Sequence, residues 1–256
     1  MTERPKYIAS CSGGKDSIAT LLLAAHHDEP LDEVVFSEVM FDSKTSGEVP
    51  EHHDFIYDKL KPFCENELGV KFTVLRAEKT YDDVFHHIIV RGPHMGEKRG
   101  FVWGGMCAVN RDCKIPPIRK YNASLSSDSI SYVGIAADEP DRLARLDETK
   151  QVSLLDKYDF TEADAFKLCA EYDLLSPIYA HCRRNGCWFC PNASDAELRH
   201  MIVNHPELFD RLIEWEQEEN VFHRRLTRKE TPSEIKMRLS GVYQAEISHS
   251  TTSILL

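Results

Sequence analysis

The first half of the chain alternates short apolar runs with segments whose apolar residues recur at helical spacing. The runs rich in β-branched and aromatic residues predict strands at residues 7–10, 34–41, 71–75 and 129–136. Apolar residues three and four positions apart predict helices over residues 17–26 and 51–68. Because strands separated by helices pair in parallel through crossover connections, this order predicts a doubly wound, mostly parallel α/β sheet.

The pattern becomes helical in the second half. Thr161 and Asp164 have the spacing of a capping box, which predicts that a helix starts there. Two more helices are predicted, at residues 195–204 and 206–217. The glycine-rich residues 91–106 show neither period, so we expect a loop there. We therefore expect an α/β domain over residues 1–158 and a helical, cysteine-containing region over residues 159–256.

The composition excludes several classes of protein. A chain of 256 residues with 42% hydrophobic residues is long and apolar enough to bury a core and is not disordered. Its apolar stretches are shorter than the roughly 20 residues that a bilayer-spanning helix needs, and no charged and apolar leader opens the sequence. We therefore expect a cytoplasmic protein with no membrane partner. In a reducing compartment, the eight cysteines are better suited to metal ligation than to disulfides.

The strongest chemical signal lies at the junction of the first strand and the first helix. Its residues are Ser12, Gly13, Gly14, Lys15, Asp16 and Ser17. A helix N-terminus offers N–H groups and the positive end of the helix dipole to an anion, the glycines let the backbone come close, and Lys15 adds a charge. This segment therefore predicts a polyphosphate site. Its spacing differs from the Walker A motif, and the alternative interpretation is a plain turn.

This hexapeptide resembles the pyrophosphate loop of the PP-loop ATP pyrophosphatase superfamily. The rest of the chain resembles the phosphoadenosine phosphosulfate (PAPS) reductase-like family within it. The matching segments are residues 39–42, 48–52, 111–118, 134–142 and 186–191. The resemblance covers residues 7–215 and implies an adenine nucleotide alpha hydrolase-like, Rossmann-like fold that binds ATP.

The resemblance also implies roles for individual residues. The hexapeptide would hold the β and γ phosphates of ATP, while Phe41 and Asp42 would flank the adenosine. Gly134 would lie close to the nucleotide, and Arg142 belongs to a partly matching arginine signature. Polyphosphate chemistry generally needs Mg²⁺, which Asp42 or Asp16 would hold. The cofactors implied are therefore ATP and Mg²⁺.

A second chemical signal is a cluster of cysteines in the helical region. Cys182, Cys187 and Cys190 are spaced C-x4-C-x2-C, which lets neighbouring thiolates reach one metal centre. The fourth ligand would be Cys113 or Cys107, and Cys113 lies in a segment that resembles the family. Four thiolates fit a [4Fe–4S] cluster, which the resemblance to cluster-bearing members favours, and they also fit Zn²⁺. Thiols without a metal are the third interpretation.

Together these features predict an enzyme that cleaves ATP to AMP and pyrophosphate and adenylates an acceptor. Lys15 and Asp16 would be catalytic, with Lys15 stabilising the leaving pyrophosphate. A sulfur donor would then displace AMP from the acceptor. One alternative is a PAPS-type sulfonucleotide reductase, which ranks lower because no cysteine follows Cys190 to serve as nucleophile. The other alternative is a nucleotide-binding module without turnover.

Charge bears on the nature of the acceptor, which is tRNA, DNA or a small molecule in this interpretation. The net charge of −11 repels nucleic acid at long range. A nucleic-acid acceptor would therefore need a local basic patch, or a partner protein that delivers it.

Overall fold

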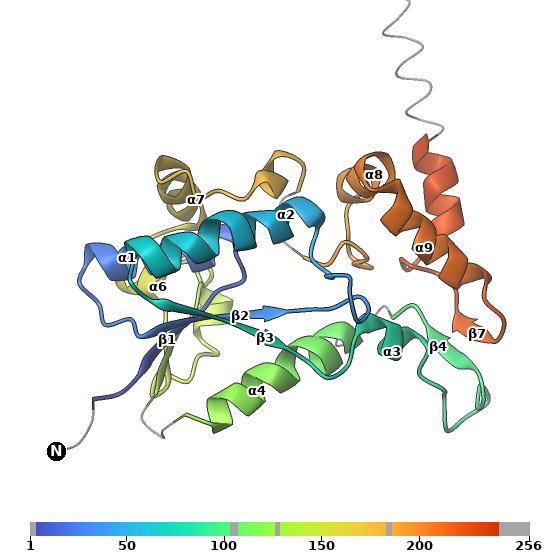
Figure 1. The fold of residues 1–256 in the computed structure, drawn as a ribbon, viewed down its shortest axis with the longest axis horizontal. Helices are drawn as coiled ribbons and strands as arrows, with labels where there is room; N and C mark the ends of the chain where they lie inside the picture. The colour runs from blue at the N-terminus through green and yellow to red at the C-terminus, as the bar shows by residue number, and fades with distance from the viewer. Residues whose placement is uncertain (1–3, 103–106, 126–128, 183–185, 241–256) are drawn as a thin grey trace, which may run out of the picture. The chain divides into compact units, whose positions relative to one another are not determined.

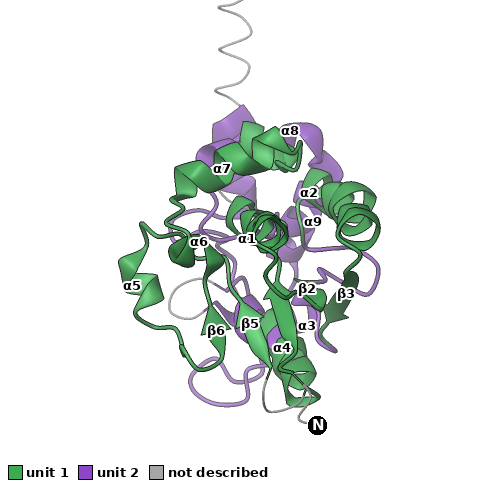
Figure 2. Cartoon of the chain, turned by 90° about the vertical axis from the view of Figure 1, so that its left-hand side faces the viewer, with its two compact units in different colours: residues 1–39, 48–77, 114–185 green, residues 40–47, 78–113, 186–256 purple. Residues whose placement is uncertain are grey.

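The chain of this computed structural model forms two compact units, shown in different colours in Figure 2. The structure describes residues 4–102, 107–125, 129–182 and 186–240. The first unit comprises residues 1–39, 48–77 and 114–185, and the second comprises residues 40–47, 78–113 and 186–256. The units therefore do not divide after residue 158 as expected. Residues 159–185 belong to the first unit because Leu168, Cys169 and Leu174 join its hydrophobic core.

The first unit is built on a five-stranded sheet. Its strands are β1 (Tyr7–Ser10), β2 (Glu33–Glu38), β3 (Lys71–Arg76), β5 (Ile130–Tyr132) and β6 (Gln151–Val152). They lie in the order β3-β2-β1-β5-β6, and every neighbouring pair is parallel. The central strand β1 pairs through Ala9 with Val34 on one side and with Tyr132 on the other. The predicted α/β class is confirmed.

Helices cover both faces of this sheet. They are α1 (Lys15–His26), α2 (Pro50–Phe55), α4 (Ile115–Ala123), α5 (Pro140–Leu143), α6 (Leu154–Lys157) and α7 (Glu162–Glu171). Helix α2 continues as two π-helical turns, Ile56–Leu60 and Phe63–Glu67, and a 3₁₀ turn spans Pro177–Ala180. Figure 1 shows α1 and α2 on one side of the sheet and α4 on the other, so the sheet is doubly wound as predicted.

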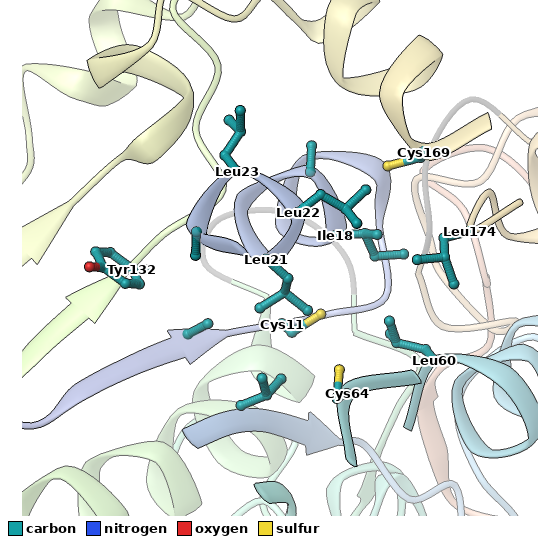
Figure 3. Packing of buried hydrophobic residues seen from close by; sticks show 14 of the residues in the cluster. Cys11, Ile18, Leu21, Leu22, Leu23, Leu60, Cys64, Tyr132, Cys169 and Leu174 are labelled. Carbon is teal, nitrogen blue, oxygen red and sulfur yellow. The ribbon is translucent and has the colours of Figure 1, made fainter. Parts of the chain in front are cut away.

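The core of the first unit centres on α1 (Figure 3). Ile18, Leu21, Leu22 and Leu23 point in different directions from this helix, yet each is at most 1% exposed. Burying one such side chain stabilises a fold by about 1.5–3 kcal/mol. Because α1 starts directly after the glycine pair, this packing holds the start of the helix in place.

The predicted capping box at the start of α7 is confirmed. The Thr161 hydroxyl accepts a hydrogen bond from the backbone N–H of Asp164 at 3.2 Å, and the Asp164 carboxylate accepts one from the N–H of Thr161 at 3.2 Å. These bonds satisfy two N–H groups that a helix start otherwise leaves without partners. The local sequence alone therefore determines where α7 begins.

The second unit contains short strands and several helices. Its elements are α3 (Tyr81–Phe85), β4 (Lys98–Gly100), α8 (Asp195–Asn204), α9 (Pro206–Gln217), β7 (Val221–His223) and a helix over residues 232–240, with a π-helical turn at Asn110–Lys114 leading into α4. Helices α8 and α9 have the predicted bounds. Strands β4 and β7 pair in parallel, so the loop expected over residues 91–106 contains a strand. Residues 103–106 lie outside the described part. No helix among the described residues has the length and hydropathy to span a membrane.

Aromatic side chains form the core of the second unit. The ring of Phe41 lies 4.5 Å from the rings of both Trp188 and Trp215, between centroids. Tyr81 stacks on Phe189 at 4.0 Å. Such pairs add about 0.5–1.5 kcal/mol each beyond the burial of their area. A compact aromatic core of this kind can hold together a unit with little regular sheet.

Candidate functional site

A cavity of about 560 Å³ opens in the first unit at the carboxyl ends of β1 and β5. Its wall is made of Ser10, Cys11, Ser12, Gly14, Lys15, Asp16, Ser17, Ser37, Lys114, Ile118, Val133, Gly134, Ile135, Arg142, Leu146, Gln151, Glu162 and Tyr179. The chain moves outward in one direction from β1 to β3, and in the other direction from β5 to β6. The cavity thus lies where the strand order reverses, which is where open α/β sheets bind ligands.

The first glycine of the pair, Gly13, adopts a backbone conformation that favours glycine. Gly13 has φ of +73°, which lies in the left-handed region. A Cβ atom there would lie 2.9 Å from the His52 ring and 2.9 Å from the Ile56 side chain. Both the conformation and the space therefore require glycine at this position. The turn brings Gly14 to the N-cap position of α1, so the start of the helix faces the cavity.

The buried His52 side chain supports this turn through hydrogen bonds of both ring nitrogens. Its Nε2 lies 3.0 Å from the carbonyl oxygen of Ser12, and its Nδ1 lies 2.8 Å from the hydroxyl of Ser176. A carbonyl only accepts, so Nε2 carries the proton and Nδ1 accepts from Ser176. Burial lowers the pKa of His52, although nearby Glu48 opposes this. The histidine is therefore a neutral, buried support of the loop.

Hydrogen bonds within the segment fix the remaining backbone. The Ser17 hydroxyl donates to the carbonyl of Gly14 at 2.9 Å and accepts from the N–H of Ser12 at 3.2 Å. The Cys169 thiol of α7 donates to the carbonyl of Lys15 at 3.2 Å. The loop is thus preformed, which lowers the entropic cost of binding a ligand.

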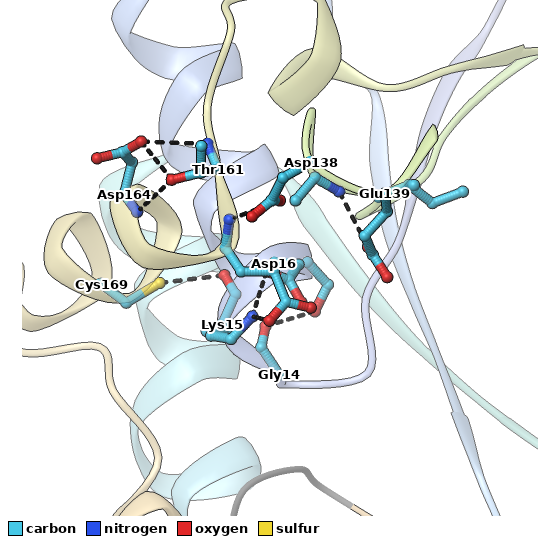
Figure 4. Close-up of polar contacts among 12 residues, drawn as sticks. Gly14, Lys15, Asp16, Asp138, Glu139, Thr161, Asp164 and Cys169 are labelled. Carbon is cyan, nitrogen blue, oxygen red and sulfur yellow. Dashed lines mark hydrogen bonds and ion pairs between the residues drawn. The ribbon is translucent and has the colours of Figure 1, made fainter. Parts of the chain in front are cut away.

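The Lys15 ammonium lies among carboxylates in the cavity wall (Figure 4). It is 2.7 Å from Asp16 and 3.4 Å from Glu162, and its side chain is 12% exposed. Burial raises the pKa of Asp16 above its usual value, although the hydrogen bond from Lys15 opposes the rise. The group therefore combines a cation suited to phosphate with a carboxylate suited to a hard divalent ion.

The loop after β5 forms another part of the cavity wall. A Cβ atom on Gly134 would lie 2.7 Å from the backbone nitrogen of Ser17, so the loop can approach α1 this closely only with glycine. Farther along, Glu139 accepts hydrogen bonds from the Arg142 guanidinium at 2.6 Å and 2.8 Å. The same carboxylate accepts from the N–H of Ala136 at 3.2 Å, as part of the contacts drawn in Figure 4. Glu139 thus orients Arg142 in the cavity wall.

The structure brings together most of the predicted loop residues and adds others. Ser12, Gly14, Lys15, Asp16, Ser17, Gly134 and Arg142 all line the cavity, and Gly13 shapes the turn. Lys114 and Tyr179 line it too, although no local sequence motif indicates a role in binding for either. Lys114 is the N-cap of α4, and its carbonyl accepts from the Ser37 hydroxyl at 3.1 Å. Its ammonium forms no ion pair with any residue that the structure describes.

Phe41 and Asp42 are not among the residues that line this cavity. Phe41 is fully buried in the aromatic core of the second unit, and the Arg211 guanidinium lies over its ring at 4.4 Å. The Asp42 oxygens accept from Arg211 at 2.5 Å and from the N–H groups of Lys44 and Thr45 at 2.7 Å each. Burial would raise the pKa of Asp42, but these donors lower it to about 2. These contacts assign both residues to the internal structure of their own unit.

Four predicted or alternative metal ligands act electrostatically on one buried phenol in the second unit, that of Tyr81. Burial raises the pKa of Tyr81 well above its usual value, and neighbouring thiols raise it further. They belong to Cys187, Cys107, Cys190 and Cys113. The backbone N–H of Cys190 donates to the carbonyl of Cys187 at 3.0 Å, a tight turn that fits the C-x2-C spacing.

These thiols differ in their surroundings. Cys113 is fully buried, and burial raises its pKa to about 12, with a further contribution from Asp112. Cys107 is exposed, whereas Cys187 and Cys190 are half-buried. Cys182, the remaining predicted ligand, belongs to the first unit, where its N–H donates to the carbonyl of Ile178 at 2.7 Å. The second unit therefore contains four of the candidate cysteines, but among the described residues no three cysteine sulfurs lie within 4.8 Å of one another.

No protein-family model and no curated protein matches the chain. Among solved structures, the chain is similar to the U34-tRNA thiolase NcsA from Methanococcus maripaludis with its [4Fe-4S] cluster. The two share 16% sequence identity with a TM-score of 0.41, over 83% of this chain and 73% of that chain. A similarity at this level leaves the chemistry of the site to be inferred from its own residues.

Proposed function

We propose that the first unit binds ATP, with the triphosphate against residues 12–17, and cleaves it between the α and β phosphates. The observation that carries the proposal is the cavity at the reversal of strand order, which a preformed glycine turn and a helix N-terminus line. Its volume of about 560 Å³ falls within the usual range for small-molecule sites, roughly 300–1,000 Å³. Three cationic side chains in its wall favour a polyanionic ligand.

The three cations would share the charge of the triphosphate. Lys15 projects from the helix start and would contact the β and γ phosphates, which become the leaving pyrophosphate. Lys114 lines the cavity at the start of α4 and has no carboxylate partner among the described residues, so a phosphate would neutralise it at little cost. Arg142, held by Glu139, would supply a further donor to a phosphoryl oxygen.

The proposed chemistry needs no covalent nucleophile from the protein. An oxygen atom of the acceptor would attack the α phosphorus, the bond to the bridging oxygen would break, and pyrophosphate would leave. Fixed N–H groups and Lys15 stabilise the negative charge that develops on it. Mg²⁺, when bound, neutralises part of the same charge. Asp16 is the residue that would hold the ion, because its carboxylate lines the cavity, whereas Asp42 is not among the residues of the cavity wall.

The same proposal assigns sulfur transfer to the adenylated acceptor, with a [4Fe–4S] cluster as the element that the thiols hold. The turn that joins Cys187 to Cys190, with Cys113 and Cys107 in the same unit, supports a four-thiolate centre. Cys113, Cys187 and Cys190 would be ligands in either case, and the fourth would be Cys182 or Cys107. A cluster supplies redox or sulfur-carrying chemistry, whereas Zn²⁺ on the same thiols would be structural.

Nucleotide binding and product identity test the proposal on the full-length chain. Calorimetry with ATP and Mg²⁺ is expected to show saturable binding, and phosphorus NMR is expected to show slow conversion of ATP to AMP and pyrophosphate. Lys15→Ala should weaken ATP binding at least tenfold and abolish this conversion, because charge-assisted contacts to phosphate are lost. Lys167→Ala is the matched control, since this exposed lysine of α7 is not part of the cavity wall.

Each other outcome points to a different function. ADP and phosphate as products would contradict cleavage at the α phosphate. ATP binding without any product, even with cell-derived RNA or DNA offered as acceptor, would support a nucleotide-binding module. Sulfite released from PAPS with thiol reductants, together with no turnover of ATP, would favour the sulfonucleotide reductase.

A further inference from the structure

Tyr179 is the only aromatic residue among the described residues that line the cavity. It lies in the 3₁₀ turn Pro177–Ala180, far along the chain from the glycine turn. Its hydroxyl oxygen accepts a hydrogen bond from the backbone N–H of Lys15 at 2.9 Å. This N–H belongs to the first residue of α1, one of the groups that a helix start offers to an anion. A phenol therefore already occupies a donor that a phosphate would use.

The Tyr179 hydroxyl can still donate one hydrogen bond. A tyrosine hydroxyl accepts and also donates one proton. Since its oxygen accepts from Lys15, the proton must point elsewhere, and no residue that the structure describes accepts it. The oxygen lies in the wall of a cavity that three cations line. The unused proton is thus available to a ligand in that cavity.

Neighbouring contacts hold the phenol at this position. Ser176, three residues earlier, donates to His52 at 2.8 Å, and His52 in turn donates to the carbonyl of Ser12 at 3.0 Å. The ring of Phe166 packs edge-on against Tyr179 with centroids 6.0 Å apart. The 3₁₀ turn is therefore linked directly to the start of α1 through Tyr179 and Lys15, and its N-cap Ser176 is linked to the glycine turn through His52.

The electrostatic setting favours donation by this hydroxyl. In a chain of hydrogen bonds from N–H to O–H to an anionic oxygen, each bond polarises the next. Burial raises the pKa of Tyr179 to about 12, although the bond from Lys15 opposes the rise, so the phenol keeps its proton at neutral pH. Asp16 and Glu162 are the negative groups that act on it, and the Lys15 ammonium lies against both.

We propose that Tyr179 donates its hydroxyl proton to a β- or γ-phosphoryl oxygen and so extends the anion-binding surface of the helix start. The inference rests on the proposed function and deepens it, because it identifies the group that recognises the pyrophosphate part of the nucleotide. Tyr179 would bind the β and γ phosphates, which leave as pyrophosphate, whereas AMP lacks these phosphates and would not contact it.

Calorimetry on Tyr179→Phe tests this inference, with pyrophosphate, ATP and AMP as separate probes in the presence of Mg²⁺. Loss of one charge-assisted hydrogen bond should weaken pyrophosphate and ATP binding roughly tenfold or more, and AMP binding should stay within twofold. Tyr172→Phe is the control, because its hydroxyl contacts His26 and does not line the cavity.

Unchanged pyrophosphate affinity in the phenylalanine variant would overturn the inference while leaving the proposed function intact. Tighter binding would also overturn it, since Tyr179 would then compete with phosphate for the Lys15 N–H. If the wild-type chain binds neither pyrophosphate nor ATP, the proposed function fails together with the inference. A wild-type measurement guards against a variant that does not fold. The Tyr179 Cζ signal of carbon-13-labelled protein should shift on addition of pyrophosphate and not of AMP, and a signal that pyrophosphate leaves unmoved would contradict the inference.

Discussion

The two units differ in what forms their candidate sites: the backbone in one and side chains in the other. In the first unit, backbone geometry makes the site: a left-handed glycine, a helix N-terminus and a loop that approaches α1 at Gly134. In the second unit, side chains make it: the thiols of four cysteines, in a unit whose core is aromatic. A backbone site depends on the absence of side-chain atoms, whereas a thiol site depends on the presence of particular ones.

This difference teaches which substitutions each site tolerates. Adding a single methyl group at a close backbone approach displaces the main chain, which has no rotamer to escape into. Removing a sulfur atom from the thiol group leaves the surrounding fold and takes away one ligand. The two sites are therefore expected to fail independently, and substitutions in one should leave the ligand of the other in place.

The largest effect is expected from Gly134→Ala. The added Cβ would meet the backbone nitrogen of Ser17 at 2.7 Å and the carbonyl carbon of Asp16 at 2.8 Å. Overpacking of this kind costs about 1–3 kcal/mol. A shift of about 1 Å in a catalytic loop lowers turnover roughly a hundredfold. Denaturant unfolding and ATP turnover measure the two effects, and iron or zinc content should stay unchanged.

Gly69→Ala is the control for the preceding variant. Gly69 has φ of +64°, but nothing lies within 4 Å of its Cβ position. Only the backbone strain remains, at about 1–2 kcal/mol. ATP turnover should therefore survive in Gly69→Ala, and normal turnover in Gly134→Ala would show that the close approach is not needed.

The second largest effect is expected on metal content, which should depend on the thiols of the second unit and not on thiols buried elsewhere. Cys187→Ala should lower bound metal to a small fraction of the wild-type amount after anaerobic purification, while ATP affinity stays within twofold. Cys64→Ala is the control, since this fully buried thiol belongs to the hydrophobic core of the first unit. It should keep full metal content and lose only stability. Iron, sulfide and zinc analysis with a visible spectrum gives the readout.

The same measurement on Cys107→Ala and Cys182→Ala identifies the fourth ligand. The variant that loses metal belongs to the ligand set, and the other should resemble Cys64→Ala. Full metal content in Cys187→Ala would instead contradict a thiol-held centre in the second unit.

Local features of both units were predictable from the sequence, and distant ones were not. The hexapeptide and the Thr161 cap were predictable because a few consecutive residues determine each of them. Tyr179 reaches the Lys15 N–H across 164 positions, and nothing near Tyr179 in sequence indicates that contact. Lys114 lies at the N-cap of a helix that the apolar pattern did not reveal.

The division into two units could not be predicted from local sequence patterns, for the same reason. Each unit is assembled from separated segments, so a change of pattern near residue 159 did not mark the boundary. Strands β4 and β7 consist of three residues each and pair residue 98 with residue 221. Strands so short carry too few residues to show a period of two.

A third prediction concerns Asp42, whose role the structure places inside the second unit. Asp42→Asn should lower the free energy of unfolding by about 2 kcal/mol near neutral pH, because a charge-assisted bond to Arg211 is lost. The folded pKa of about 2 lies below the usual value near 3.9. The stabilisation is therefore present above about pH 4 and lost as the pH falls through about 2.

Urea unfolding of wild type and Asp42→Asn between neutral pH and pH 2 checks this sign. The gap between the two proteins should close as the pH falls below about 4. ATP affinity should be unaffected, since Asp42 is not in the cavity wall. A loss of Mg²⁺-dependent ATP binding in this variant would contradict this prediction and indicate that Asp42 acts in the nucleotide site.

The smallest effects are expected at two matched helix starts, one in each unit. Thr161 caps α7 through a box with Asp164, and Ser194 caps α8 through a box with Glu197. Replacing either cap by alanine should cost about 1 kcal/mol of stability. Neither residue lines the cavity, so ATP affinity should stay within twofold in both variants. A Thr161→Ala variant that loses ATP binding while Ser194→Ala does not would show that α7 must be firmly seated on α1 for the loop to hold its shape. The hydrogen bond from Cys169 to the carbonyl of Lys15 is one of the contacts that join α7 to the start of α1.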